Sequence, residues 1–249
     1  MLLPSRRVLI PVLALAGAAL GATTATATGG WLPGSNLSSV AGSSSAAAVT
    51  PDIAVNADGV AVAVWIADDG NGTSDTWAAR FSPLEGWGTP VDLAGPATSW
   101  ARVVAEPSGA FTAVWVDSGV LQSARYTLSN GAWSWGTAQQ VSHDGPNTGG
   151  LSYGSRIRAP ALAVDAGGAV TAAWRRQVTP TSGSQHYIIQ AARRATGAGS
   201  WGSVSDDLSP NSVTDLNTNF CDADAPAVAA GASGSAVVTW RIQTKSGSC

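Results

Sequence analysis

The residues able to do chemistry in this chain are few and lie far apart in the sequence. Its two histidines, His143 and His186, lack the close spacing of a metal-ligand pair. The sequence has no H-E-x-x-H motif and no phosphate-binding loop. The two glutamates, Glu85 and Glu106, both fall in short turns between apolar segments. The sequence therefore predicts no catalytic residue, and it favours a binding function over an enzymatic one.

One acidic segment resembles a metal-binding loop. The run DDGNGTSD at 68–75 alternates oxygen-bearing side chains with glycine, as calcium loops do, and its ligands would be Asp69, Asn71 and Asp75. It lacks the terminal glutamate and the flanking helices of an EF-hand. An ordinary polar loop is the favoured interpretation, with calcium as the alternative, and we expect no other cofactor.

An internal repeat supplies the elements that must position any site. Each of four units has a glycine six positions before a tryptophan, and the pairs are Gly59 and Trp65, Gly109 and Trp115, Gly168 and Trp174, and Gly234 and Trp240. A unit opens with two apolar runs joined by a turn, and a third run then carries an arginine. A fourth run begins at a tryptophan. Four strands per unit are typical of a propeller blade.

We therefore predict an all-β fold, a β-propeller of four-stranded antiparallel blades. The repeat region spans 28–249, and its units lie near 51–93, 101–141, 160–208 and 226–249. Trp31 matches the start of a fourth strand, so the segment near 31–38 is expected to be a closing outer strand. These units amount to about three full blades and one or two partial ones. This chain is then either the N-terminal part of a longer propeller or a four-bladed ring with a three-stranded closing blade.

The first residues have the features of a signal peptide. Arg6 and Arg7 precede an apolar stretch at 8–22, and Ala25 and Ala27 have the spacing of a cleavage site. We expect cleavage after Ala27, a secreted extracellular protein of bacterial type, and no membrane span after cleavage. The paired arginines fit the twin-arginine route as well as the general secretory one.

Composition narrows the partners. The leader holds two of the 13 basic residues, which leaves 11 basic against 16 acidic ones in the mature chain. Lys245 is the single lysine, and the arginines are scattered. Because nucleic-acid binding needs a basic patch, nucleic acid is excluded as an expected partner.

The two cysteines, Cys221 and Cys249, are expected to form one disulfide. An exported protein folds in an oxidising compartment, where an even pair of cysteines is usually bridged. A turn at 231–234 would bring the two ends of its hairpin together and place both cysteines within reach. Two free thiols are the alternative.

The repeat resembles the degenerate blades of secreted bacterial proteins related to the sialidase-like, Asp-box propeller group. The turns SPLEGW at 82–87, LSNGAW at 128–133 and TGAGSW at 196–201 keep the glycine and tryptophan of the Asp-box but lack its aspartate. The resemblance implies the fold more than an activity. Sialidases grip a carboxylate with three arginines, and Arg80, Arg125 and Arg193 recur here at one place in three units. Because these three arginines occupy the same position in their units, a structural pairing is favoured over a catalytic role. The recurring tryptophans are expected to pack between blades.

The unequal loops are the candidate binding face, because insertions in repeat proteins gather on one face. We place the segments 66–75, 142–158, 175–186 and 209–224 there. Their polar and aromatic groups would suit a sugar, although ordinary solvated loops are the other interpretation. The candidate ligand-binding residues are Trp100, Arg102, Asp117, His143, Asp144, Tyr153, Arg156, Arg158, Arg175 and His186.

The leading hypothesis is a secreted, non-catalytic binding propeller that takes an extracellular glycan or protein on this long-loop face. The first alternative is an N-terminal fragment of a sialidase-like glycoside hydrolase. The second alternative is an extracellular structural scaffold.

Overall fold

A computed structural model describes residues 34–38, 48–68, 73–95, 98–146, 150–181, 183–210, 216, 220–232 and 234–244. The chain divides into Met1–Ser35 and Asn36–Cys249, and the second unit contains every strand that is described. The predicted signal peptide lies outside the described residues, as do Cys249 and the side chain of Cys221. The disulfide therefore stays a prediction.

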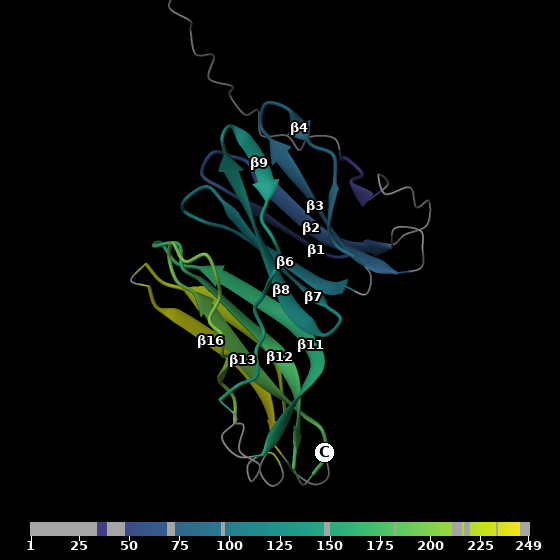
Figure 1. Ribbon diagram of the computed structural model, residues 1–249, viewed down its shortest axis with the longest axis vertical. Coiled ribbons are helices and arrows are strands. Elements are labelled where there is room, and N and C mark those ends of the chain that lie inside the picture. Colours follow the sequence, from purple (N-terminus) through teal and green to yellow (C-terminus); the bar gives the residue numbers. More distant parts are fainter. Residues whose placement is uncertain are drawn as a thin grey trace, which may run out of the picture. The chain divides into compact units, whose positions relative to one another are not determined.

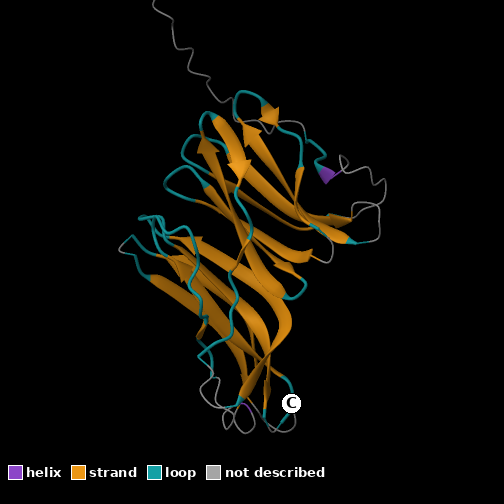
Figure 2. Ribbon diagram, in the orientation of Figure 1, coloured by secondary structure: helices purple, strands orange, loops and turns teal. Residues whose placement is uncertain are grey.

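The fold is all-β, and its antiparallel sheets are the blades of an incomplete propeller (Figures 1 and 2). Blade 1 has the order β1-β2-β3-β4, with β5 also paired to β3, and blade 2 has the order β10-β8-β7-β6, with β9 also paired to β8. In each blade the two short segments together make the fourth strand. The bounds are β1 (Val49–Val55), β2 (Ala61–Asp68), β3 (Ser74–Ser82), β4 (Gly86–Trp87), β5 (Val91–Ala94), β6 (Thr98–Ala105), β7 (Phe111–Asp117), β8 (Val120–Ser129), β9 (Ala132–Trp135) and β10 (Gln139–Gln140).

Blade 3 is longer than its sequence indicates. It comprises β11 (Leu151–Val164), β12 (Val170–Pro180), β13 (His186–Arg194) and β14 (Asp206–Asp207). The interpretation of 142–158 and 175–186 as loops is therefore wrong over 151–158, 175–180 and 186, which are strand, and that of 66–75 and 209–224 is wrong over 66–68, 74–75 and 220–224. Val178, Ile188 and Leu151 form an additional apolar cluster there, which explains why the strands extend beyond the repeat.

The fourth unit is the hairpin of β15 (Phe220–Ala230) and β16 (Ala236–Thr244). It lies against β11 and β12. One parallel residue pair, Tyr187 with Asp222, also joins it to β13. The described residues thus form three blades and the first hairpin of a fourth.

The glycine of each repeat closes the turn between the first two strands. In blade 1 the N–H of Gly59 donates to the carbonyl of Asn56, and the same bond recurs from Gly109, Gly168 and Gly234. All four glycines have φ between 75° and 91°, which side chains rarely adopt. This backbone requirement accounts for the repeated glycine.

The core lies between blades, because both faces of the central strands are apolar. Val62, Val64 and Ile66 of blade 1 pack against the face of blade 2 that carries Trp115, which is 1% exposed. Val114 and Val116, on the other face of blade 2, pack with Trp174 of blade 3. The prediction that the recurring tryptophans pack between blades is confirmed for Trp115 and Trp174.

The two end faces of the stack carry exposed apolar side chains. Ile53 on β1 is 55% exposed, whereas its repeat equivalent in blade 2, Val103, is buried against blade 1. Val237 on β16 is 62% exposed, whereas its equivalent Val62 is buried. A further blade would cover such faces, as the described blades cover each other.

The segment near 31–38, expected to be a closing outer strand, is only partly described. Residues 34–38 contain no strand, and 31–33 lie outside the described residues. Leu37 packs against a cluster that holds Trp65, Ala67 and Ala79 on the outer face of blade 1. The segment therefore contacts the outer face of blade 1, and its pairing as a strand stays a prediction.

Two tight turns of blade 2 give a matched test of packing between blades. Gly119, between β7 and β8, and Gly131, between β8 and β9, have φ of 83° and 77°. A Cβ at Gly131 would meet open space, whereas a Cβ at Gly119 would overlap the backbone carbonyl of Ser155 in blade 3. Gly131→Ala should cost about 1–2 kcal/mol in the free energy of unfolding. Gly119→Ala should cost at least about 1 kcal/mol more, because the overlap displaces β11. Urea denaturation measures both, and equal losses would contradict the contact.

Candidate functional site

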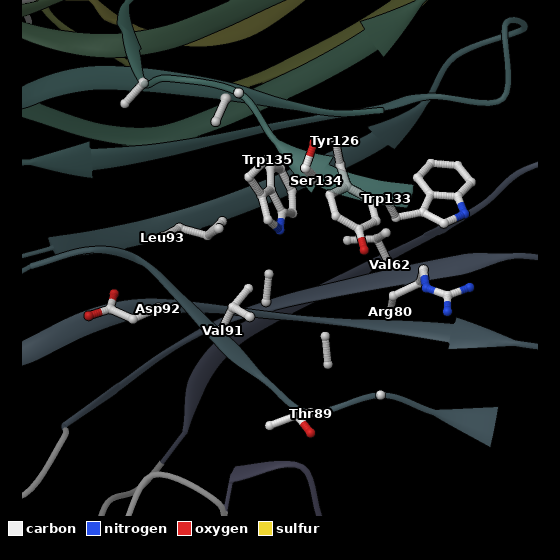
Figure 3. Close-up of a pocket in the computed structure, with 16 residues that line it drawn as sticks. Val62, Arg80, Thr89, Val91, Asp92, Leu93, Tyr126, Trp133, Ser134 and Trp135 are labelled. Carbon is white, nitrogen blue, oxygen red and sulfur yellow. The ribbon is translucent and has the colours of Figure 1, made fainter. Parts of the chain in front are cut away.

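A groove of about 350 Å³ lies between blades 1 and 2. Blade 2 contributes aromatic side chains from β8 and β9, and blade 1 contributes the segment that leads into β5 (Figure 3). The lining residues that matter for binding are Arg80, Asp92, Leu93, Tyr126, Trp133 and Trp135.

The aromatic wall is set by strand register. Tyr126 on β8 lies opposite Trp135 on β9, and their ring centroids are 4.8 Å apart. The ring of Trp133 stacks on Tyr126 at 5.1 Å and 21°. Burial raises the pKa of Tyr126, and the charge of Arg80 and a hydrogen bond with it offset this only in part. The phenol therefore stays protonated at neutral pH and can both donate and accept a hydrogen bond.

The opposite wall comes from blade 1. The N–H of Gly88 donates to the carbonyl of Arg80 at 2.8 Å and fixes the chain that leads to Val91 and Leu93. Leu93 is half-buried and packs on the core, whereas Val91 is 44% exposed. On β5 the Asp92 carboxylate is exposed and accepts the N–H of Ala94 at 2.9 Å. Apolar surface thus faces the aromatic wall, with a carboxylate and a guanidinium at its edges.

This groove exists because the repeat is broken at one position. The position of Tyr126 in blade 2 is held by Phe81 in blade 1 and by Arg194 in blade 3. Between blades 2 and 3, Arg194 reaches across to the Glu106 carboxylate at 2.6 Å and lies over the ring of Trp201. Gln139 also donates to the carbonyl of Gly199 at 2.7 Å. The space equivalent to the groove is thereby bridged in that interface.

The aromatic pair has a counterpart on the outer face of blade 1. Phe81 and Trp87 are opposite each other in β3 and β4, with ring centroids 5.5 Å apart. Trp87 packs with the cluster around Trp65, on the face of the sheet turned away from blade 2. Trp87 and Trp135 therefore hold the same repeat position, and Trp135 lines the groove.

None of these lining residues is among the ten candidates predicted from the sequence. The repeat places the tryptophans that open fourth strands in the pattern that the blades share. The sequence feature that could have indicated the groove is one repeat position at which the blades differ, with Phe81 in blade 1, Tyr126 in blade 2 and Arg194 in blade 3. The presence of a groove depends on which of the three stands there, because Arg194 bridges the interface and Tyr126 does not.

Three of the predicted binding residues meet around Arg176 in blade 3. Its guanidinium is buried and donates to the carbonyl of His143 at 2.6 Å and to the Asp144 carboxylate at 2.8 Å. It also lies over the ring of Tyr153, whose hydroxyl donates to Asp207 at 2.6 Å. These contacts tie the chain between blades 2 and 3 to the sheet.

The other predicted residues are dispersed over blades 2 and 3. Arg175 stacks on Tyr187, with 3.6 Å from its guanidinium carbon to the ring centroid. His186 is buried at the start of β13, and Arg156 and Arg158 are exposed on β11. Trp100 and Arg102 lie on β6, and Asp117 ends β7. Within the described residues, the ten candidates do not form one common site, and only His143, Asp144 and Tyr153 meet around Arg176. Ligand binding by the ten residues stays a prediction.

The three recurring arginines all pair with acidic side chains of their own blades. Arg80 bonds Glu85 at 2.9 Å, Arg125 bonds Glu106, and Arg193 bonds Asp165. The N–H of Ala169 holds the pKa of Asp165 below its usual range. These contacts agree with the structural pairing that the equal positions indicated.

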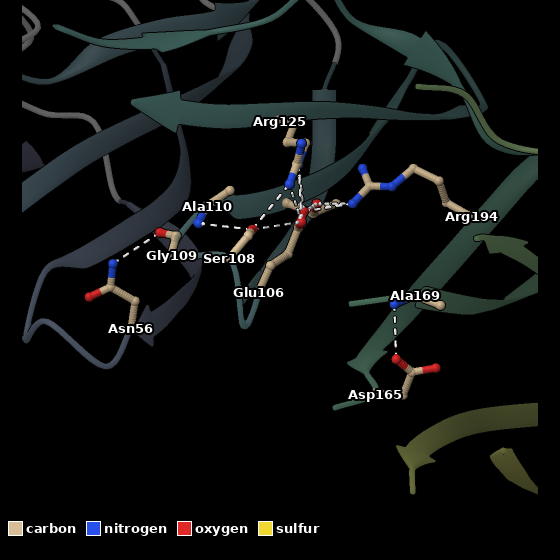
Figure 4. Close-up of polar contacts among 10 residues, drawn as sticks. Asn56, Glu106, Ser108, Gly109, Ala110, Arg125, Asp165, Ala169 and Arg194 are labelled. Carbon is tan, nitrogen blue, oxygen red and sulfur yellow. Dashed lines mark hydrogen bonds and ion pairs between the residues drawn. The ribbon is translucent and has the colours of Figure 1, made fainter. Parts of the chain in front are cut away.

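Glu106 accepts hydrogen bonds from its own blade and from blade 3 (Figure 4). It accepts hydrogen bonds from Arg125 at 2.9 Å, from Thr112 at 2.6 Å and from Arg194 of blade 3. Burial raises the pKa of Glu106, but the bonds from Arg125 and Thr112 and the charges of the two arginines outweigh burial and hold it below the ordinary value. Glu106 therefore remains ionised and joins two blades.

This pairing predicts an acid-dependent loss of stability. Because the pKa of Glu106 is lower in the folded chain, its contribution is complete above the unfolded value near 4.5 and disappears as pH falls through the folded value. Glu106→Gln should cost about 3 kcal/mol at pH 7, since it leaves Arg194 buried without its carboxylate. Glu85→Gln, in an exposed pair, should cost under about 1 kcal/mol. Denaturant titrations from pH 7 to pH 3 measure both, and a constant cost for Glu106→Gln would refute the assignment.

No metal site emerges from the described residues. Their histidine, cysteine, aspartate and glutamate side chains form no group of three that could hold a metal ion. Of the proposed calcium ligands, Asp75 is buried on β3, and Asp69 and Asn71 lie outside the described residues. Within the described ranges no helix has the length and apolarity of a membrane span.

Comparison with known proteins gives only distant likenesses. No protein-family model and no curated protein matches the sequence. Similar solved structures include a xylan β-1,4-xylosidase from Bacillus halodurans C-125, with 11% identity and a TM-score of 0.45 over 80% of this chain and 38% of that chain. An α-L-arabinanase from Cellvibrio cellulosa has 10% identity and a TM-score of 0.41 over 80% of this chain and 77% of its own. AofleA from Arthrobotrys oligospora has 11% identity and a TM-score of 0.39 over 79% of this chain and 50% of its own.

The chain thus spans less than two fifths of the length of the xylosidase. Identity near 10% and TM-scores below 0.5 carry no inference about activity. We base the fold on the sheets of this chain and base any function on its groove.

Proposed function

We propose that this chain is a secreted, non-catalytic carbohydrate-binding propeller and that the groove between blades 1 and 2 holds the sugar. The observation that carries the proposal is the aromatic wall of Tyr126 and Trp135, which faces Val91 and Leu93 across a groove with a volume of about 350 Å³ (Figure 3). A cavity of this volume fits a small ligand. Secretion rests on the leader predicted at 1–27.

The chemistry of the lining suits a sugar. A pyranose ring has an apolar C–H face that packs on an aromatic ring, and it has hydroxyls around its edge. Tyr126, Arg80 and Asp92 supply hydrogen-bond donors and acceptors at the margin of the apolar surface. A pocket with mainly apolar walls and a few placed polar groups is the usual form of a small-molecule site.

The walls are built to keep their shape. Tyr126 and Trp135 are held by an antiparallel strand pair, and Leu93 packs on the core between the blades. Because packing within the blades already positions these side chains, binding does not have to order them first. The groove therefore supports binding better than the dispersed polar residues of blade 3, whose side chains mainly bond one another.

Substitution at one repeat position tests the proposal. Trp135→Ala should reduce binding to neutral oligosaccharides at least tenfold, or about 1.4 kcal/mol, because it removes one wall of the groove. Trp87→Ala is the matched control, since Trp87 has the same repeat position on the outer face of blade 1 and should change binding less than twofold. A glycan array followed by calorimetry measures the effect. Equal losses, or binding unaffected by Trp135→Ala, would refute the groove as the site.

The absence of catalysis is tested with the sugar that binds best. The full chain should leave the length of that oligosaccharide unchanged after prolonged incubation, as measured by chromatography. Shortened products that depend on Trp135 would instead support the glycoside hydrolase alternative.

A further inference from the structure

The charges at the groove bear on which sugars it takes, and the inference rests on the proposed function. Among the described residues that line the groove, Arg80 and Asp92 are the only charged ones. Glu85 stands beside Arg80, on the turn between β3 and β4. The three side chains together carry a net charge of −1 at neutral pH.

The guanidinium of Arg80 is already engaged. Its Nη2 donates to the Glu85 carboxylate at 2.9 Å, and the phenol of Tyr126 forms a second hydrogen bond with it. Glu85 is five residues from Arg80 on one hairpin, so its carboxylate stays close at a high effective concentration. A carboxylate on a ligand would have to displace this partner before it could pair with Arg80.

Asp92 adds a second bias against anions. Its carboxylate lies on the same blade 1 wall as Arg80, is exposed and accepts the N–H of Ala94. A carboxylate also accepts protons from sugar hydroxyls, whereas it repels another carboxylate. Asp92 therefore favours a ligand that brings hydroxyl donors and no negative charge.

We propose that the groove selects neutral sugar residues and disfavours acidic ones, with Glu85 occupying Arg80 and Asp92 repelling anions. Arg125 and Arg193 are engaged in the same way by Glu106 and Asp165. None of the three recurring arginines is therefore a ready partner for a sugar carboxylate. This differs from sialidases, in which three arginines bind the carboxylate of the sugar.

The test uses sugars that differ only at C6. The full chain is titrated with glucose- and galactose-terminated oligosaccharides and with the matching glucuronic and galacturonic acid forms, at low salt and at about 0.5 M salt. The neutral member of each pair should bind at least fivefold more tightly at low salt. The difference should shrink at high salt, because screening weakens the repulsion.

Removing the counter-ion sharpens the test. Glu85→Gln should raise the ratio of acidic to neutral affinity at least threefold, since Arg80 then becomes available to the sugar carboxylate. Asp206→Asn removes one negative charge from the exposed strand β14 of blade 3 and should leave the ratio unchanged. It controls for net charge.

The outcomes separate the two proposals. Tighter binding of the acidic sugars that still depends on Trp135 would overturn the selectivity and leave the groove as the binding site. A ratio unmoved by Glu85→Gln, or moved equally by Asp206→Asn, would also overturn the selectivity. No binding of either form, or binding indifferent to Trp135→Ala, would overturn the carbohydrate function and the selectivity with it.

Discussion

The rest of the structure depends on the packing of one blade face against the next. A single blade is one sheet layer with two apolar faces, so it cannot bury its own core. In blade 2, Trp115 is buried against blade 1, and Val114 and Val116 are buried against blade 3. Each blade therefore completes the core of its neighbours, which fixes the strand register and leaves the outer strands to form grooves between blades.

The repeat explains how much of this could be predicted from the sequence. The glycine and tryptophan spacing reports a backbone turn and a packing position, and both are requirements that every blade shares. It therefore predicts the antiparallel four-stranded units and the buried tryptophans. The extension of blade 3 could not be read in this way, because Leu151 lies outside the repeat unit and its cluster with Val178 and Ile188 forms only in the folded sheet.

The candidate site shows the other limit of sequence analysis. A repeat marks what the blades have in common, whereas a groove depends on one position where they differ. Tyr126 and Arg194 occupy equivalent places, yet one leaves a cavity and the other bridges two blades to Glu106. The outcome depends both on this position and on the residue across the interface, where blade 1 has Asn56 and blade 2 has Glu106. That pairing spans two units and is absent from any local pattern.

Surroundings as well as repetition distinguish structural from binding arginines in this fold. An arginine repeated in every blade meets the same surroundings, and here each one finds an acid on its own hairpin or next to it. Its charge is thereby neutralised close to the backbone that carries it. Arg80 differs in its setting, because its blade faces an aromatic wall across open space. Arg80 therefore has a structural role that its repeat position shares with the other blades, and it also lines the groove because of its neighbours. Its counter-ion Glu85 then helps to determine which ligands can pair with it.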